Sequence, residues 1–245
     1  MSFAEHHAAV RRWLSIIRGG KTEFRTLAAL LFIVAMLLTF GLVANEMSEG
    51  DTRGFDNAIL LAMRNPDNRA DPLGPKWFED SVRDITSLGG NTVLTVIVLS
   101  TAGFLALSRA RGAALLVILS VTSGAILMST LKITFGRVRP DVITHSIIEL
   151  TRSFPSGHTT LAAITYLTLG ALLARVQSTR RLKIYVLSVA IFLTVLVGVS
   201  RVYLGAHWPT DVLAGWCLGA AWAMGCWLLA ARLQREGRVE QKMKP

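Results

Sequence analysis

The chain is poor in cysteine and in charged residues, and each shortage excludes a class of protein. Cys217 and Cys226 are the only cysteines in 245 residues, and their spacing puts them on different faces of a helix. They support neither a disulfide framework nor a cysteine-based metal site. Charged residues make up only 17% of the chain, which is too few for an ordinary soluble domain.

Apolar residues, in contrast, make up 52% of the chain, and its mean hydropathy is +0.47. They form about six runs, each near the roughly 20 residues that a helix needs to cross a bilayer. We therefore predict an all-α integral membrane bundle of about six transmembrane helices. The predicted spans are 26–44, 91–107, 113–131, 159–174, 184–199 and 212–231. The second, fourth and fifth are short, so we expect them to extend into their polar flanks.

The positions of Lys and Arg predict the orientation of this bundle. The net charge of +10 comes from short basic clusters between apolar runs, which favours topology signals over a nucleic-acid surface. The clusters lie in the N-terminal segment 1–25, in the loops after the second and fourth spans, and in the tail 232–245. Six spans place all of them on one side, so we predict that both termini are cytoplasmic.

The residues between these ends, 26–231, are predicted to form a single membrane domain. Segment 45–90 would be extracytoplasmic, and it is mixed in charge and rich in Asp, Pro and Gly. Its stretch FDNAILLAMR predicts either a short amphipathic helix at the membrane interface or part of an ordinary long loop.

Five cations lie in two short loops, 132–158 and 200–211, on the predicted extracytoplasmic side, where the topology rule does not favour them. Any one of these cations could simply extend toward lipid head groups at a helix end, but this explanation accounts less well for all five together. An anion site accounts for the whole set, because the Arg fork matches phosphate oxygens and Lys adds a point charge. The five are Lys132, Arg137, Arg139, Arg152 and Arg201.

The motif Pro155-Ser-Gly-His158 lies just before the fourth span. Pro and Gly interrupt a helix, so we expect Ser156 and Gly157 at a helix N-terminus, where free N–H groups and the helix dipole bind anions. A plain turn followed by a surface histidine is the alternative for this motif alone. Together with the distant arginines, the motif favours a phosphate site.

The stretch SRVYLGAHWPTD precedes the sixth span and contains a possible histidine–carboxylate pair. If a helix begins near His207 or Pro209, His207 and Asp211 lie one turn apart on one face. The carboxylate then fixes the histidine tautomer and leaves the other ring nitrogen with a free lone pair. A capping Asp beside an idle His is the alternative, but an ionisable pair at a membrane boundary favours a functional role.

Two histidines, several cations and a helix N-terminus on one side predict phosphoryl transfer. One histidine would attack phosphorus and the other would donate a proton to the leaving oxygen, while the cations stabilise charge. No cluster of acids suited to Mg²⁺ lies near these residues in the sequence, so we predict a metal-independent reaction without a cofactor.

Together, these motifs resemble the signature of the type 2 phosphatidic acid phosphatase superfamily. KITFGRVRP (132–140), PSGH (155–158) and SRVYLGAHWPTD (200–211) match Lys-x6-Arg-Pro, Pro-Ser-Gly-His and Ser-Arg-x5-His-x3-Asp. The resemblance extends from the second span to the end of the chain, and it includes the six-span layout of the membrane branch.

The resemblance implies a role for each matching residue. His207 would be the nucleophile that forms a phosphohistidine, Asp211 would orient it, and His158 would protonate the leaving group. The phosphate would be held by Lys132, Arg139, Ser156, Gly157 and Arg201. Arg137, Arg152 and Tyr203 lie outside the signature and would either shape the pocket or bind a second phosphate.

The expected protein is therefore a lipid phosphatase of the bacterial cytoplasmic membrane, with its site on the extracytoplasmic face. By analogy with family members of this size, we favour undecaprenyl diphosphate as the substrate, with phosphatidylglycerophosphate, phosphatidic acid and lipid A phosphates as competitors. A lipid phosphotransferase is a second class. A transporter or non-enzymatic binder of anionic lipids is a third, which the two histidines disfavour.

The sequence leaves the oligomeric state open. Gly215 and Gly219, with Ala223 beyond them, predict either a dimer face or, as we favour, close packing within the bundle.

Overall fold

The structure is a computed structural model, and it describes residues 3–140 and 152–235, with side chains between residues 23 and 233. The regular secondary structure of this part of the chain is helical, apart from one isolated β-bridge between Arg64 and Pro72. The helices are α1 (Phe3–Glu49), α2 (Arg53–Ala62), α3 (Lys76–Ser87), α4 (Asn91–Leu107), α5 (Arg111–Phe135), α6 (Gly157–Val176), α7 (Arg180–Tyr203) and α8 (Pro209–Arg235).

Five of these helices, α1 and α5 to α8, are long and apolar enough to cross a membrane. Helices α3 and α4 reach that length only as a pair, which is bent by 45° at the break between them, and they bring the number of candidate spans to six. The prediction of an all-α membrane bundle with about six spans is therefore confirmed. That both termini are cytoplasmic stays a prediction.

Five helices are longer than their predicted spans, whereas α4 coincides with the second span, 91–107, so the expected extension of that span is wrong. Helices α6 and α7 extend at both ends beyond 159–174 and 184–199, into polar residues as expected. Helix α1 continues without a break from residue 26 back to Phe3, and α8 continues to Arg235. Hydropathy detects only the membrane-embedded part of a helix, because backbone hydrogen bonding does not stop where the apolar residues stop.

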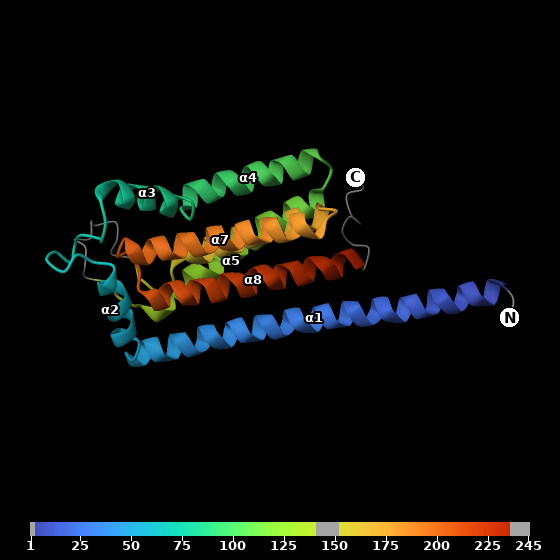
Figure 1. Cartoon of the computed structure of the whole chain (residues 1–245), viewed down its shortest axis with the longest axis horizontal. Helices are drawn as coiled ribbons and strands as arrows, with labels where there is room; N and C mark the ends of the chain where they lie inside the picture. Colours follow the sequence, from blue (N-terminus) through green and yellow to red (C-terminus); the bar gives the residue numbers. More distant parts are fainter. Residues whose placement is uncertain (1–2, 141–151, 236–245) are drawn as a thin grey trace.

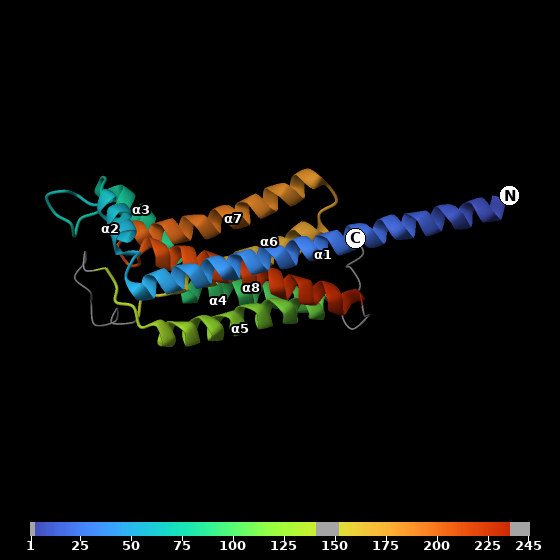
Figure 2. The same cartoon turned by 90° about the horizontal axis from the view of Figure 1, so that it is seen from below.

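All three motifs lie at one end of the bundle. The last turns of α5 and α7, the first turn of α8, and α2 gather at the left of Figures 1 and 2. The N-terminal end of α1 and the end of α8 lie at the opposite end (Figure 1).

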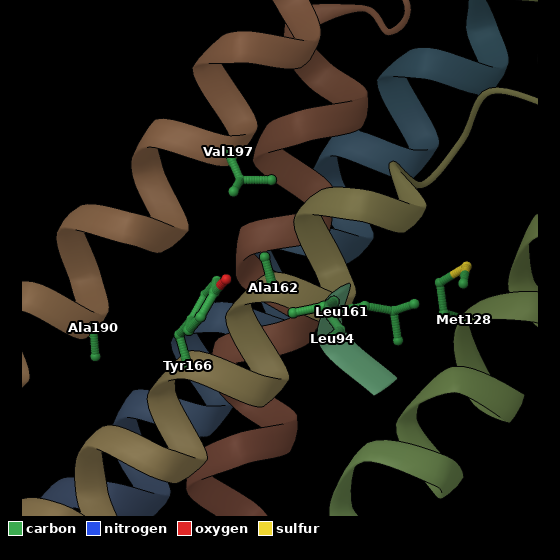
Figure 3. Close-up of a cluster of buried hydrophobic side chains, with 7 residues drawn as sticks. All are labelled: Leu94, Met128, Leu161, Ala162, Tyr166, Ala190 and Val197. Atoms are coloured by element: carbon green, nitrogen blue, oxygen red, sulfur yellow. The ribbon is translucent and has the colours of Figure 1, made fainter. Parts of the chain in front are cut away.

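Helix α6 is the centre of the bundle and packs against α5, α7 and α8. Its side chains meet those of α4, α5 and α7 in a buried apolar cluster (Figure 3). The cluster consists of Leu94, Met128, Leu161, Ala162, Tyr166, Ala190 and Val197. The Tyr166 hydroxyl donates a hydrogen bond of 2.7 Å to the Leu88 carbonyl, so its polar atom is satisfied at the C-terminal end of α3.

Helices α6 and α8 approach each other closely at two glycines. A Cβ atom added to Gly219 would lie 2.5 Å from the Ala163 Cβ and 2.8 Å from the Thr160 carbonyl oxygen. One added to Gly215 would lie 3.1 Å from the Ser156 carbonyl oxygen. Packing within the bundle therefore accounts for this glycine spacing. The closeness holds the first turn of α6 against the first turns of α8.

Candidate active site

The fold brings every predicted site residue to the same end of the bundle. Lys132 lies in the last turn of α5, Arg201 in the last turn of α7, and Asp211 in the first turn of α8. His158 is the second residue of α6, and its helix begins at the same end. The residues are thus assembled in space, while their individual roles stay predictions.

His207 and Asp211 form the pair that the sequence predicts. His207 lies in the connection before α8 with 1% of its surface exposed, and its Nδ1 is 3.4 Å from the Asp211 Oδ2. A proton on Nδ1 faces the carboxylate, so Nε2 keeps its lone pair. Burial lowers the pKa of His207 to about 4, against the opposing effect of Asp211, so the ring is neutral at neutral pH.

Asp211 is fully buried and has donors on both carboxylate oxygens. Its Oδ2 accepts hydrogen bonds from the Ser153 hydroxyl and, at 3.0 Å, from the Trp208 N–H. Its Oδ1 accepts one of 2.6 Å from the Arg137 Nη1. A buried carboxylate needs such partners to stay ionised, and so many donors make it an orienting group rather than a base. Ser153 also lies 3.3 Å from the His207 Nδ1.

Arg137 connects this pair to α2. Its Nη1 also donates to the Thr210 hydroxyl at 2.8 Å, while its Nη2 donates to Thr52 at 3.2 Å and to the Asp56 carboxylate at 2.5 Å. Its guanidinium carbon lies 5.4 Å from the centre of the Trp208 ring, which is within cation–π range. Both terminal nitrogens are engaged, so these contacts favour a pocket-shaping role for Arg137 over a second phosphate site.

Asp56 is a buried acid that sequence reasoning missed. It is 0% exposed on α2, and its two oxygens accept the Thr210 N–H at 2.9 Å and the Thr210 hydroxyl at 2.7 Å. The stretch FDNAILLAMR does form a short helix, but no motif spacing connects its acid to the site. Ser153 was also missed, and its only signal is its position two residues before Pro155.

The three cations that are predicted to bind phosphate are each half-buried. Arg139 donates to the Ala206 carbonyl at 2.7 Å, and Arg201 donates to the Thr86 hydroxyl of α3 at 3.2 Å. The third cation is Lys132, and its Nζ would lie 3.9 Å from a Cβ atom added to Gly157. The Lys ammonium therefore lies near the N-terminus of α6, an arrangement that suits an anion.

The turn before α6 forms the predicted helix N-terminus, and the hydroxyl of its serine contacts another side chain of α6, while phosphate binding by Ser156 stays a prediction. Ser156 is the N-cap of α6 and is 0% exposed. Its hydroxyl is 2.8 Å from the Thr159 hydroxyl, and its N–H donates to the Asp211 carbonyl at 3.1 Å. The backbone of Gly157, in the first turn of the helix, is thus the better placed part of this turn to contact a phosphate.

Tyr203 and Arg152 have different surroundings. The Tyr203 hydroxyl donates to the Leu73 carbonyl at 2.7 Å, and its ring packs edge-on against Phe78, so it holds segment 45–90 against α7. Arg152 is exposed beside Gly136. Among the residues that the structure describes, no group of three or more His, Cys, Asp or Glu side chains is arranged to hold a metal ion.

A membrane helix bundle with two histidines, a buried aspartate and three cations at one end defines a membrane phosphatase that acts on lipid phosphates. The chain belongs to the PAP2 superfamily, whose sequence pattern matches residues 113–235, from α5 through α8.

Two curated relatives and one solved structure are similar to this chain. Phosphatidylglycerophosphatase B of Bacillus subtilis is 31% identical over 192 residues, which cover 77% of this chain and 87% of the relative. An undecaprenyl-diphosphatase of Sulfolobus acidocaldarius is 29% identical over 154 residues, covering 59% and 68%. The crystal structure of a PAP2-type phosphatidylglycerolphosphate phosphatase from Bacillus subtilis covers 83% of this chain and 96% of its own, with 29% identity and a TM-score of 0.68.

Proposed function

We propose that this protein hydrolyses a lipid phosphate or diphosphate through a phosphohistidine on His207. The observation that carries the proposal is the buried contact of 3.4 Å between the His207 Nδ1 and the Asp211 Oδ2. It leaves the Nε2 lone pair of a neutral histidine beside a set of cations, which is what a nucleophile toward phosphorus requires.

The reaction takes two steps. In the first, the His207 Nε2 attacks phosphorus, the P–N bond forms and the P–O bond to the lipid breaks, while His158 gives its proton to the leaving oxygen. In the second, water attacks phosphorus and the P–N bond breaks, while His158 takes a proton from the water. Lys132, Arg139 and Arg201 balance the charge on the phosphoryl oxygens. The products are dephosphorylated lipid and phosphate, and the enzyme is regenerated.

Phosphatidylglycerophosphate is the first candidate substrate. The Bacillus subtilis phosphatidylglycerophosphatase B covers more of this chain, at higher identity, than the undecaprenyl-diphosphatase does. Undecaprenyl diphosphate, which the sequence-based analogy favours, is the second candidate, and the Sulfolobus relative supports it. Both lipids present a terminal phosphate at the membrane surface while their tails stay in the bilayer.

Phosphate release from purified protein in detergent tests both candidates. The panel contains these two lipids, phosphatidic acid and a lipid A phosphate, with and without EDTA, and His207→Ala is the control. We expect free phosphate from at least one lipid, undiminished by EDTA, and a phosphoenzyme that mass spectrometry locates on His207. Phosphate that appears on a second lipid instead of in solution would indicate a phosphotransferase. Activity lost with EDTA and restored by Mg²⁺ would contradict the metal-free mechanism.

The site is proposed to face the extracytoplasmic side, because the basic clusters lie at the other end of the bundle. Single cysteines test this in a background in which Cys217 and Cys226 are replaced by Ala. The two variants are Asp67→Cys and Ser178→Cys. Asp67 lies in the exposed loop at the site end, and Ser178 lies between α6 and α7. An impermeant thiol reagent applied to intact cells, with any outer membrane permeabilised, should label the first and spare the second. The opposite pattern would place the site in the cytoplasm.

A further inference from the structure

A continuous set of buried hydrogen bonds leads from α2, outside the three motifs, to the histidine–aspartate pair. We propose that Asp56 and Arg137 are positioning residues that hold the Asp211 carboxylate in place against His207. The proposal rests on the proposed role of His207 as the nucleophile. It assigns a catalytic purpose to segment 45–90, which lies outside the matched PAP2 region.

Arg137 is held from two sides at once. Its Nη1 contacts α8 through Thr210 and Asp211, and its Nη2 contacts the start of α2 through Thr52 and Asp56. The planar guanidinium fixes the angle between these two sets of bonds, which the single nitrogen of a Lys does not. With 11% of its side chain exposed, Arg137 is also largely shielded from competing water.

Asp56 fixes the other side of the same junction. It accepts the Thr210 N–H near the start of α8, where a helix leaves N–H groups without intrahelical partners. It therefore acts on Asp211 by two routes, through Arg137 and through the backbone of the preceding residue. Both routes depend on a carboxylate that is 0% exposed.

The two carboxylate oxygens of Asp211 have different hydrogen-bond partners. Oδ2 faces His207, Ser153 and the Trp208 N–H, whereas Arg137 is the only described residue with a hydrogen bond to Oδ1. Without Arg137, that buried oxygen would have no donor among the described side chains, and the carboxylate would turn to find one. His207 would then lose its fixed tautomer, although the phosphate-binding cations would be unchanged.

The test compares Arg137→Gln, Arg137→Lys and Asp56→Asn with two exposed controls of the same residue types, Arg53→Gln and Asp51→Asn. Losing a residue that orients a metal-binding histidine typically costs about 10–100-fold in activity, and we use that range as the scale for the orienting residues here. We expect such a fall in kcat for Arg137→Gln, a smaller one for Arg137→Lys and Asp56→Asn, and none for the controls. KM and the inhibition constant of inorganic phosphate should stay within about threefold, because the relay formed by Asp56 and Arg137 does not touch substrate.

A second measurement asks whether the effect passes through Asp211. In an Asp211→Asn background, assayed with radiolabelled lipid, adding Arg137→Gln should cost less than about threefold, whereas adding Lys132→Gln should cost its full amount. If Arg137→Gln weakens phosphate inhibition, Arg137 is a phosphate ligand and the proposal is wrong. Full additivity with Asp211→Asn, or an equal loss in the controls, would also overturn it.

Melting temperatures separate these outcomes from misfolding. If Arg137→Gln does not fold, Arg137→Lys and Asp56→Asn carry the comparison, because Arg137→Lys keeps the positive charge and Asp56→Asn keeps the side-chain volume and one acceptor oxygen. The proposed function fails on a different result, namely full activity of His207→Ala, and that result does not depend on any relay variant.

Discussion

The two sides of the site differ in how completely the folded protein fixes them. On the dyad side, His207 and Asp211 are at most 1% exposed and are enclosed by hydrogen bonds from Ser153, Trp208 and Arg137. On the clamp side, Lys132 and Arg139 come from one motif and Arg201 from another, and all three keep part of their surface in solvent. The proposed nucleophile is thus oriented before substrate arrives, while the proposed clamp stays open to an anion.

The difference follows from what each side must do. A nucleophilic histidine needs a neutral ring and a single tautomer, and burial beside a fixed carboxylate provides both. A phosphate clamp must exchange water for phosphate oxygens in every turnover, so its cations cannot be enclosed in the same way. Changes on the dyad side should therefore alter kcat, and changes on the clamp side should also alter phosphate affinity.

The largest expected effect separates the two histidines. His207→Ala removes the attacking atom, so it should abolish both turnover and phosphoenzyme on every substrate. His158→Ala leaves the nucleophile and removes the proton donor, which typically costs about 10²–10⁴-fold. Because p-nitrophenolate leaves without a proton, His158→Ala should recover much of its activity on p-nitrophenyl phosphate relative to a lipid monophosphate.

Steady-state rates on the two substrates, with phosphoenzyme measured by mass spectrometry, check this prediction. Wild-type protein must first turn over p-nitrophenyl phosphate, with phosphoenzyme formation limiting the rate. Equal losses for both variants on both substrates, with intact folding, would contradict the separate roles. An active His207→Ala would mean that the nucleophile is misassigned.

A smaller effect is expected from the clamp. Lys132→Gln, Arg139→Gln and Arg201→Gln should each lower kcat/KM by about 10²–10³-fold, the usual cost of losing one donor to developing charge. Unlike the relay variants, they should also raise the inhibition constants of inorganic phosphate and vanadate. A clamp variant with unchanged phosphate inhibition would remove the distinction between the two sides.

Most of the clamp and the dyad could be predicted from the sequence, because their residues lie in short motifs with fixed spacing. The pair His207 and Asp211 depends only on one helical turn, and the placement of Ser156 and Gly157 depends only on a helix start. Asp56 could not be predicted, because its contact with Thr210 joins residues far apart in the chain and no local pattern encodes it. The bend between α3 and α4 was missed for a similar reason, since hydropathy reports length and not direction.

A moderate effect on stability is expected where α6 meets α8. Gly219→Ala places a methyl group in severe overlap with Ala163, which should destabilise the fold by about 1–3 kcal/mol. Gly225→Ala is the matched control on the same helix, because nothing lies within 4 Å of the added Cβ. The melting temperature in detergent should fall by about 2–12 °C for the first variant and stay level or rise for the second. Equal melting temperatures would mean that the helices separate easily.

The smallest expected effect concerns pH. Burial lowers the pKa of His207 to about 4, against an unfolded value of 6.5, so the unfolded chain binds a proton before the folded protein does. The stability linked to neutral His207 is therefore full above about pH 6.5 and is lost as pH falls toward 4. His207→Gln should lose less melting temperature than wild type between pH 7 and pH 5. A steeper loss in the variant would contradict the buried neutral ring.

The close approach of α6 and α8 has a consequence for how the enzyme responds to its membrane. At Gly215 and Gly219 the contact is made by main chain and small side chains, which have no long rotamers to readjust. A change in bilayer thickness tilts helices, but these two are expected to tilt together as one rigid body. Since α6 carries His158 and α8 begins just after His207, the spacing of the two reactive rings is expected to stay constant. Lipid composition should then affect how substrate enters the site, and not the bond-breaking step.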